Sequence, residues 1–524
     1  MAKIYFISFY DEYALGLRYL SAVAEKEGHQ VKMAFLHLLS ELRIMDPDES
    51  RDDIVPDSPL AVTNCEMKLL LDDVSQFNPD YVCISLASAL YGLASVTTKQ
   101  LRKISDAVII WGGIDPTLNP DDGKQNADVV CVGEGEKALM EFIRRGKDWQ
   151  NFTDPINNLL INTKTGWISG EVGLMTEDIN TIPFPDFDLS HSVYISDNQI
   201  YKGEYSPKCR LHDRIIIITS RGCPYSCSYC CHSSLRRIYH GGKYLRLRTP
   251  ENVIEELVIR KRENPNLKMI EIEDDVFTTS LEWIEKFVIH YKEKINLPFW
   301  CFTHPQKSDE RIFIKLKEAG LQSVTFGVQS GSERVLKEVF KRKTPIADIM
   351  KTAKMLNKLG FRYVVDLIAS NPLETEEDRR QTLKLLLSLP KPYLLHPVNP
   401  LTFYKNHPIT EMAFEQGIDL ILSPGTNKYG PPGNPDYKYF DLLYTMAQFP
   451  GLDENNFYDI VNDPYLRENP NLLEAMVQAL QAGNFYKGDI YTSKDQHMER
   501  LESRLAELYG SRLVNLAIKF KKKS

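Results

Sequence analysis

Short apolar runs alternate with helix-like segments over roughly the first 145 residues. The segments at 3–8, 29–36, 79–88 and 106–113 are mostly apolar, as expected for strands buried in a sheet. Between the first two, Leu17, Leu20 and Ala24 recur at helical spacing before Gly28 ends the segment. The alternation predicts an α/β fold, with a doubly wound parallel sheet over residues 1–148.

A second alternating series begins near residue 213. Apolar runs near 214, 269, 299, 323, 362 and 393 are separated by helical segments. Pro250 follows Thr249 at a first helical position, and "TEED" at 375–378 has the spacing of a capping box. Six parallel strands are too few for a closed eight-fold barrel. We therefore expect a partial (β/α)6 TIM-type barrel over residues 213–410, with its chemistry at the carboxyl ends of the strands.

The remaining stretches carry weaker patterns. Residues 149–212 include the proline-bearing "NTIPFPDFDLS", which indicates a connector between the two alternating regions. Residues 411–524 begin with a Pro/Gly/Tyr-rich stretch and continue with "NLLEAMVQALQAG" and "MERLESRLAELYG", typical of helices. The prediction there is a mostly helical C-terminal region.

Composition narrows the class of protein. Apolar residues make up 43% of the chain and charged residues 26%, as in globular proteins that bury a core. A net charge of -8 does not suggest a broad nucleic-acid-binding surface. No apolar run approaches the ~20 residues of a membrane span, and the first residues lack a signal-peptide layout. We therefore expect a cytoplasmic protein with reduced thiols.

Four of the nine cysteines lie within "SRGCPYSCSYCC" at 220–231. Cys223, Cys227 and Cys230 have Cys-x3-Cys-x2-Cys spacing, which can ligate three irons of a [4Fe–4S] cluster and leave the fourth open. Cys231 is poorly placed as a fourth ligand because adjacent side chains diverge. Zinc held by three of these cysteines and His232 is an alternative, as is a metal-free thiol loop. Elsewhere, core packing is the expected role of buried cysteines.

The stretch "RGCPYSCSYC" resembles the cluster motif of the radical S-adenosylmethionine (SAM) superfamily. In that family the open iron binds the amino and carboxylate groups of SAM. The resemblance places "EIEDDVF" near the SAM amino group, "FGVQSGSERVL" near the ribose and carboxylate, and "LIASNPLETEED" beside the adenine. It implies the SAM-binding residues Tyr229, Glu273, Asp274, Asp275, Gln329, Ser330 and Asn371. Gln329 stands where many relatives have glutamate, and an amide can still bond a ribose hydroxyl.

The first region resembles the Rossmann-like, cobalamin-binding-type domain that precedes many radical SAM barrels. The resemblance rests on "LGLRYLSAVAEKEGHQV", "IIWGGIDPT" and "DVVCVGEGEKAL". Gly112, Gly113, Gly133 and Gly135 would let backbone approach a bulky ligand, or would simply form tight turns. Cobalamin carriers often have Asp-x-His-x-x-Gly after the first strand, whereas this chain has "FYDEYALG". Retention and loss of cobalamin both stay open at this point.

The resemblance implies an enzyme with a [4Fe–4S] cluster, SAM and cobalamin as cofactors. Such an enzyme reductively cleaves SAM to a 5'-deoxyadenosyl radical, which abstracts hydrogen from an organic or peptide substrate for cobalamin-dependent C-methylation. It needs a low-potential electron donor such as a flavodoxin or ferredoxin. The alternatives are a radical cyclase, rearrangement or oxidation enzyme with a vestigial cobalamin domain, and a non-catalytic iron–sulfur electron carrier. A dinucleotide oxidoreductase is disfavoured because no G-x-G-x-x-G follows the first strand.

Overall fold

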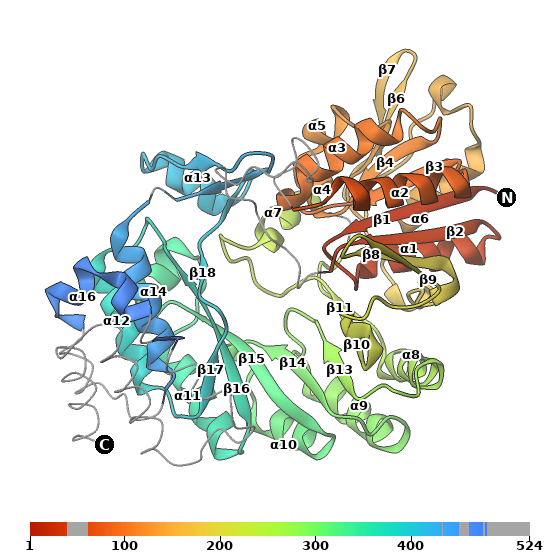
Figure 1. Ribbon diagram of the computed structural model, residues 1–524. Helices are drawn as coiled ribbons and strands as arrows, with labels where there is room; N and C mark the ends of the chain where they lie inside the picture. The colour runs from red at the N-terminus through yellow and green to blue at the C-terminus, as the bar shows by residue number, and fades with distance from the viewer. Residues whose placement is uncertain (39–60, 241, 432, 450–460, 475–476, 479–524) are drawn as a thin grey trace.

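A computed structural model describes residues 1–38, 61–240, 242–431, 433–449, 461–474 and 477–478. The N-terminal domain contains a parallel sheet in the order β5-β4-β3-β1-β2, with helices on both faces (Figure 1). This confirms the predicted doubly wound sheet. Its elements are β1 (Lys3–Phe9), α1 (Leu15–Lys26), β2 (Gln30–Leu36), α2 (Asn64–Phe77), β3 (Tyr81–Ser85), α3 (Tyr91–Leu101), β4 (Val108–Gly112), α4 (Ile114–Leu118), α5 (Pro120–Lys124), β5 (Val129–Cys131) and α6 (Glu136–Arg145).

Alternate residues of β1 enter different cores. Ile4 and Phe6 pack with α1 and α6 in a core that continues into the barrel. Tyr5 and Ile7 pack with α2 and α3 in a second core on the opposite face. Period-two alternation thus buries both sides of the strand, which explains its unbroken apolar sequence.

Residues 149–212 do more than connect the two domains. They form β6 (Leu159–Thr163), β7 (Gly166–Ser169), β8 (Ser192–Ser196) and β9 (Gln199–Lys202). The β6–β7 hairpin extends the sheet beyond β5, and β8 pairs in parallel with β2. The predicted connector is therefore corrected, because its strands complete both edges of a nine-stranded sheet.

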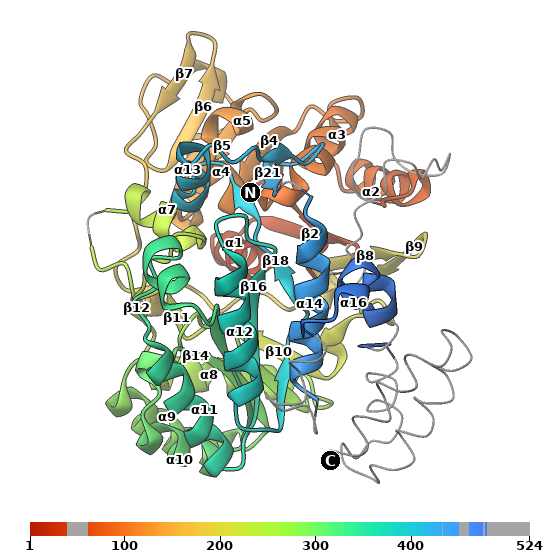
Figure 2. The same cartoon turned by 90° about the vertical axis from the view of Figure 1, so that its left-hand side faces the viewer.

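The second region is an open barrel of six parallel strands in the order β10-β13-β14-β15-β16-β17 (Figures 1 and 2). This confirms the predicted partial barrel. The strands are β10 (Arg214–Ile217), β13 (Met269–Ile272), β14 (Phe299–Thr303), β15 (Leu321–Gln329), β16 (Arg362–Ala369) and β17 (Tyr393–Leu395). The helices are α7 (Cys231–Ile238), α8 (Pro250–Glu263), α9 (Leu281–Lys294), α10 (Glu310–Glu318), α11 (Ile346–Lys358) and α12 (Glu376–Ser388), and a short ribbon joins β11 (Ser220–Arg221) to β12 (Arg246–Leu247).

The chain beyond the barrel returns to the N-terminal domain before it packs on α12. Lys405 forms an ion pair with Asp122 at 2.9 Å, and the Asn406 amide donates to the Leu118 carbonyl. Described elements here are β18 (Asn399–Pro400), β19 (Phe403–Tyr404), α13 (Pro408–Glu415), β20 (Ile421–Leu422), β21 (Lys428–Gly430), α14 (Pro435–Ala447) and α16 (Pro464–Glu468). Most of the two predicted C-terminal helical stretches lies outside the described residues.

Candidate active site at the domain junction

The three predicted cluster ligands lie on one loop at the carboxyl end of the barrel. Cys223 and Cys227 are buried, while Cys230 is partly exposed and precedes the first turn of α7. Burial, together with the nearby Asp275, Cys230 and Cys227, raises the pKa of the Cys223 thiol to about 12. The surrounding protein therefore does not stabilise the Cys223 thiolate, whereas a bound iron ion would. This donor set fits a cluster held by three cysteines.

The loop is braced from several elements. Arg236 on α7 donates to the backbone carbonyls of Cys223 and Tyr225. The Tyr225 ring stacks on His304, just beyond β14, with ring centroids 3.8 Å apart. The Ser228 hydroxyl donates to the Val339 carbonyl at 2.6 Å. These contacts fix the loop backbone before any metal binds, as a cluster site requires.

His232 is not free to act as a zinc ligand in this arrangement. Its two ring nitrogens lie 2.6 Å from the Tyr244 hydroxyl and 2.8 Å from an Asp275 carboxylate oxygen. Ligand atoms of Cys230, Cys231 and His232 do come within 4.8 Å of one another. A zinc ion bound to His232 would have to replace one of these two hydrogen bonds, so the geometry makes that alternative less favourable.

The three predicted acidic residues after β13 point to different partners. Asp274 is buried and accepts hydrogen bonds from the backbone N–H and hydroxyl groups of Thr219 and Ser220. Asp275 contacts His232. Burial and the neighbouring Glu271 raise the pKa of Glu273 to about 7. Asp274 thus supports the chain that leads into the cysteine loop, and Glu273 and Asp275 stay the better candidates for contact with SAM.

Polar atoms without partners gather at the ends of β15 and β16. Within the described residues, the Gln329 amide oxygen and the Asn371 amide nitrogen are buried and have no hydrogen-bond partner. Ser330 is fully buried and donates to Glu374 at 3.3 Å. Burial raises the pKa of Glu374 to about 8. Unpaired buried polar atoms are costly, so these amides suit the hydroxyl and base edges of a nucleoside ligand.

Tyr229 has a buried cation as its neighbour. The Arg342 guanidinium lies 3.5 Å from the Tyr229 hydroxyl and 4.0 Å from the Cys227 sulfur, and it donates to the Gly327 carbonyl at 2.8 Å. Sequence reasoning did not identify Arg342, because no local pattern ties it to a cysteine more than a hundred positions earlier. A positive charge beside a ligand sulfur would favour the reduced cluster.

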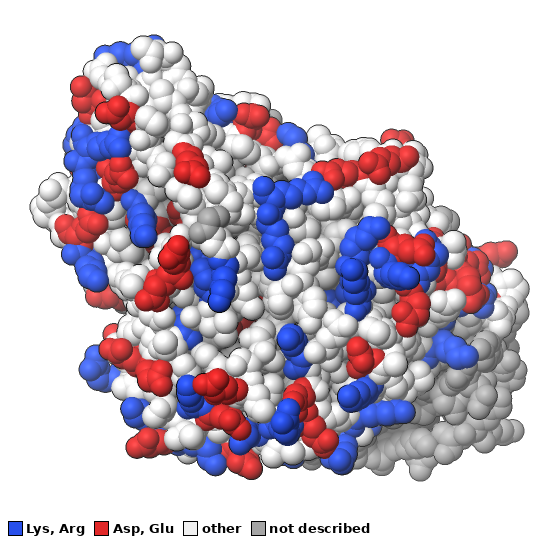
Figure 3. All heavy atoms as spheres, turned by 180° about the vertical axis from the view of Figure 1, so that it is seen from behind, with Lys and Arg blue, Asp and Glu red and all other residues white. Residues whose placement is uncertain are grey.

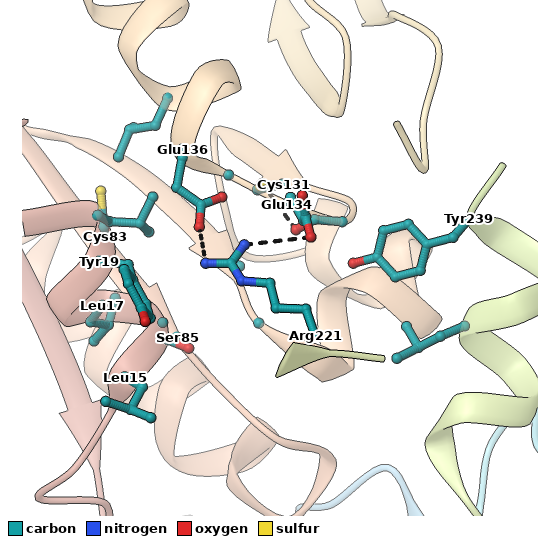
Figure 4. A pocket seen from close by; sticks show the side chains of 18 of the residues that line it. Leu15, Leu17, Tyr19, Cys83, Ser85, Cys131, Glu134, Glu136, Arg221 and Tyr239 are labelled. Carbon is teal, nitrogen blue, oxygen red and sulfur yellow. Dashed lines mark hydrogen bonds and ion pairs between the residues drawn. The ribbon is translucent and has the colours of Figure 1, made fainter. Parts of the chain in front are cut away.

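A cavity of about 320 Å³ lies at the carboxyl ends of the N-terminal strands (Figure 4), and Arg221, Gly222 and His232, which flank the three cysteines in sequence, line its barrel side. Its walls are mainly apolar, with Leu15, Leu17 and Cys83 on one side and Tyr239 on another. All four predicted glycines, Gly112, Gly113, Gly133 and Gly135, line it. Position and lining fit the apolar face of a bulky ring ligand at a sheet switch point, as expected for the corrin ring of cobalamin.

The glycines have a second role inside the protein. A Cβ on Gly113, whose φ is +97°, would lie 2.9 Å from the Leu86 backbone. A Cβ on Gly133 would approach the Tyr239 ring of the barrel region at 3.2 Å. Both residues are therefore required by close backbone packing, whatever they contribute to a ligand.

The position that a cobalt-ligating histidine would take after β1 is occupied by Tyr13. Its hydroxyl donates to Glu271 of β13 at 3.5 Å, and Arg210 lies over its ring. Tyr13 is not among the residues that line the cavity. It serves instead as a contact between the two domains.

These features define an α/β protein with a three-cysteine metal loop that faces a ligand cavity of a second domain. Residues 217–386 match the radical SAM superfamily, and residues 7–143 match the B12 binding domain. The chain belongs to the radical SAM superfamily and carries an N-terminal B12-binding domain. It is a radical SAM enzyme whose cofactors are a [4Fe–4S] cluster, SAM and cobalamin.

Individual relatives agree with this membership. An uncharacterized methyltransferase of Pyrococcus horikoshii is 28% identical over 367 residues, which are 68% of this chain and 73% of the relative. Cytidylyl-2-hydroxyethylphosphonate methyltransferase of Streptomyces wedmorensis is 26% identical, with 67% of each chain covered. The cobalamin-dependent SAM radical enzyme OxsB, solved with aqua-cobalamin and SAM, has a TM-score of 0.64 at 13% identity. That alignment covers 99% of this chain and 79% of OxsB, and shows a shared fold.

The surface adds little that is specific. Acidic and basic side chains are interspersed over the face shown in Figure 3, with no broad field of one sign. Among the described residues, no helix combines the length and apolar character needed to cross a membrane.

Proposed function

We propose that this enzyme is a cobalamin-dependent radical SAM methyltransferase that methylates a carbon atom of an organic or peptide substrate. The observation that carries the proposal is the cavity of the B12-binding domain, whose lining includes Arg221, Gly222 and His232 on either side of the three cysteines in sequence. The two relatives described as methyltransferases support the same reaction class. We further propose a cytoplasmic location, a flavodoxin or ferredoxin as electron donor, and limits at 213–410 for the barrel and 411–524 for the C-terminal region.

When bound, the cluster supplies the electron that cleaves SAM, and cobalamin supplies the methyl carrier. Cys223, Cys227 and Cys230 would hold the cluster and leave one iron for SAM. Glu273 and Asp275 would accept hydrogen bonds from the SAM amino group. Gln329, Ser330 and Asn371 would orient its nucleoside, because their amide and hydroxyl groups lie at the ends of neighbouring strands.

On the other side, the apolar cavity walls would exclude water from a reactive centre. Gly112, Gly113, Gly133 and Gly135 would bring backbone close to the corrin ring. Because the cavity lies beside the cysteine loop, the two cofactors would be held near one substrate. This arrangement reduces the entropy that is lost when two cofactors and a substrate must come together to react.

The test is anaerobic. Protein reconstituted with iron, sulfide and cobalamin is reduced with dithionite, mixed with SAM, and assayed for 5'-deoxyadenosine and methylcobalamin. We expect both products from the parent and from Cys65→Ala, an exposed cysteine remote from the loop, and neither from Cys227→Ala. A fully loaded cluster that never cleaves SAM, or a protein that takes up only zinc, would refute the proposal.

A further inference from the structure

A buried ion-pair network crosses the junction between the two domains. Arg221 is the second residue of β11 and lies two positions before Cys223. One of its Nη atoms donates to Glu136 at 2.6 Å, and the other lies 3.4 Å from Glu134 (Figure 4). Its guanidinium also lies 5.1 Å from the centre of the Tyr19 ring of α1. The residue ahead of the cysteine loop is thus fastened to the B12-binding domain.

Arg246 completes the network. It pairs with Arg221 across the β11–β12 ribbon and donates to Glu134 at 2.7 Å and to the Thr176 carbonyl at 2.7 Å. The four charged side chains are only 9–17% exposed. Two cations face two anions, so the cluster of charges is neutral as a whole. Charge-assisted, two-pronged bonds of this kind fix side-chain geometry strongly, and the loss of one member leaves a partner uncompensated.

The chain between this network and Cys223, the first predicted cluster ligand, has little room to move. Gly222 has φ of +93°, and a Cβ there would lie 2.3 Å from the Tyr244 carbonyl oxygen. The chain between Arg221 and Cys223 therefore passes closely against the segment just before β12. A displacement of Arg221 must move Cys223, because the only intervening residue is packed against neighbouring backbone.

The same residues form part of the cavity wall. Arg221, Gly222, Arg246, Glu134 and Glu136 all line the cavity described above. We propose that Arg221 is a positioning residue that fixes the cluster loop relative to the corrinoid cavity and so sets the separation of the two cofactors. This inference rests on the proposed function, because it assumes that both cofactors bind. It extends that function by identifying the contact that fixes the cluster loop and the corrinoid cavity relative to each other.

The test measures that separation directly. The parent, loaded with cob(II)alamin and a reduced cluster, is examined by pulsed electron paramagnetic resonance, which reports the distance distribution between the two paramagnetic centres. Variants are Arg221→Gln, Arg221→Lys and Glu136→Gln, the last of which leaves the cluster loop unaltered in sequence. Arg237→Gln is the matched control, because Arg237 lies on α7 and forms an exposed ion pair with Glu411 of α13 at 2.7 Å.

We expect a narrow distribution in the parent and in Arg237→Gln, and an intermediate one in Arg221→Lys, which keeps the positive charge but lacks the forked geometry that reaches both carboxylates. Arg221→Gln and Glu136→Gln should broaden it and slow methylcobalamin formation about 10-fold or more at saturating cobalamin, because misplacement by about 1 Å can cost ~100-fold. Cluster content and cobalamin affinity should stay within about threefold of the parental values. That change is smaller than the one expected from the loss of a hydrogen bond to a charged group.

Three results would overturn the inference or its basis. Parental distributions in both Arg221→Gln and Glu136→Gln would exclude a positioning role. Cluster loss in Arg221→Gln with an unaltered Glu136→Gln would reduce Arg221 to a loop anchor and overturn it too. A parent that binds no cobalamin would sink the proposed function together with this inference. If the parent forms no methylcobalamin, methyl transfer fails, yet the distance comparison still decides the role of Arg221.

Discussion

The two sides of the domain junction each form part of a ligand site, but different kinds of groups shape them. At the carboxyl ends of the N-terminal strands, the site is shaped by backbone and apolar side chains, and Gly113 is its extreme case. At the carboxyl ends of the barrel strands, the site is shaped by hydrogen-bonded polar groups, and Asp274 with four donors is the extreme there. Steric fit is therefore the main requirement on the N-terminal side, and the placement of hydrogen-bond donors and acceptors is the main requirement on the barrel side.

Buried carboxylates show the same contrast. Burial raises the pKa of Glu134 in the cavity wall, but the hydrogen bond from Arg246 and the charge of Arg221 outweigh that effect and hold it below its usual value. Burial dominates at Glu374, where the charge of Asp378 adds to it, and the pKa rises to about 8. Charges on the cavity side are therefore fixed, while a barrel-side carboxyl changes protonation near neutral pH.

The largest expected effect separates two adjacent cysteines of the barrel side. Cys230→Ser should abolish the cluster, because a serine hydroxyl is a poor iron ligand, whereas Cys231→Ser should retain it. Iron and sulfide content with the visible absorption of the reconstituted proteins measures this. Equal losses in both variants would show that Cys231 is also a ligand.

On the cavity side, Gly113→Ala should destabilise the protein by about 3 kcal/mol. The new Cβ would meet the Leu86 backbone at 2.9 Å in a conformation that is nearly restricted to glycine. Gly28→Ala is the matched control, since Gly28 also has positive φ but has open space around it. Denaturant unfolding measures the difference, and equal costs at the two positions would mean that the backbone contact is unimportant.

Asp274→Asn should lower the free energy of unfolding by about 2 kcal/mol. Its amide nitrogen would face N–H and O–H groups that now donate hydrogen bonds to the carboxylate. Asp275→Asn, at a side chain that is 44% exposed, should cost less than about 1 kcal/mol. Unfolding curves of the two variants provide the comparison. A larger cost at Asp275 would contradict the supporting role assigned to Asp274.

The last prediction concerns pH. The folded state raises the pKa of Glu374 from its usual 4.5 to about 8, so it binds more protons than the unfolded state between these values. Its contribution to stability is fully present below pH 4.5 and is lost as the pH rises through 8. The free energy of unfolding should therefore fall more steeply between pH 5 and 8 in the parent than in Glu374→Gln. Parallel pH profiles would argue against a protonated Glu374.

Local signals in the sequence predicted local structure well. Thr375 and Asp378 form the expected capping box, and Thr249 caps α8 ahead of Pro250. "SGSE" at 330–333 has the same spacing but is less informative: Ser330 is buried against Glu374, and Ser332 instead accepts a hydrogen bond from the Val335 N–H. The spacing of a capping box does not specify where a helix begins when the preceding residues also belong to a barrel end.

Long-range pairings could not be predicted in the same way. Cys223, Cys227 and Cys230 are close in sequence, so their convergence needed only one loop. Arg221 and Glu136 are 85 positions apart, and their contact depends on how two domains pack. The strands within 149–212 were missed because prolines around them hide the short apolar runs of β6 and β8.

The pairing of β2 with β8 has a practical consequence for dissecting the protein. Met33 to Leu36 are bonded to Ser192 to Ile195, far beyond the apparent end of the B12-binding region. A fragment cut at residue 148 would leave β2 as an open edge with unsatisfied backbone groups, which invites intermolecular pairing and aggregation. A fragment that continues through β9, to about residue 205, keeps that edge covered and is the better unit in which to express this domain alone.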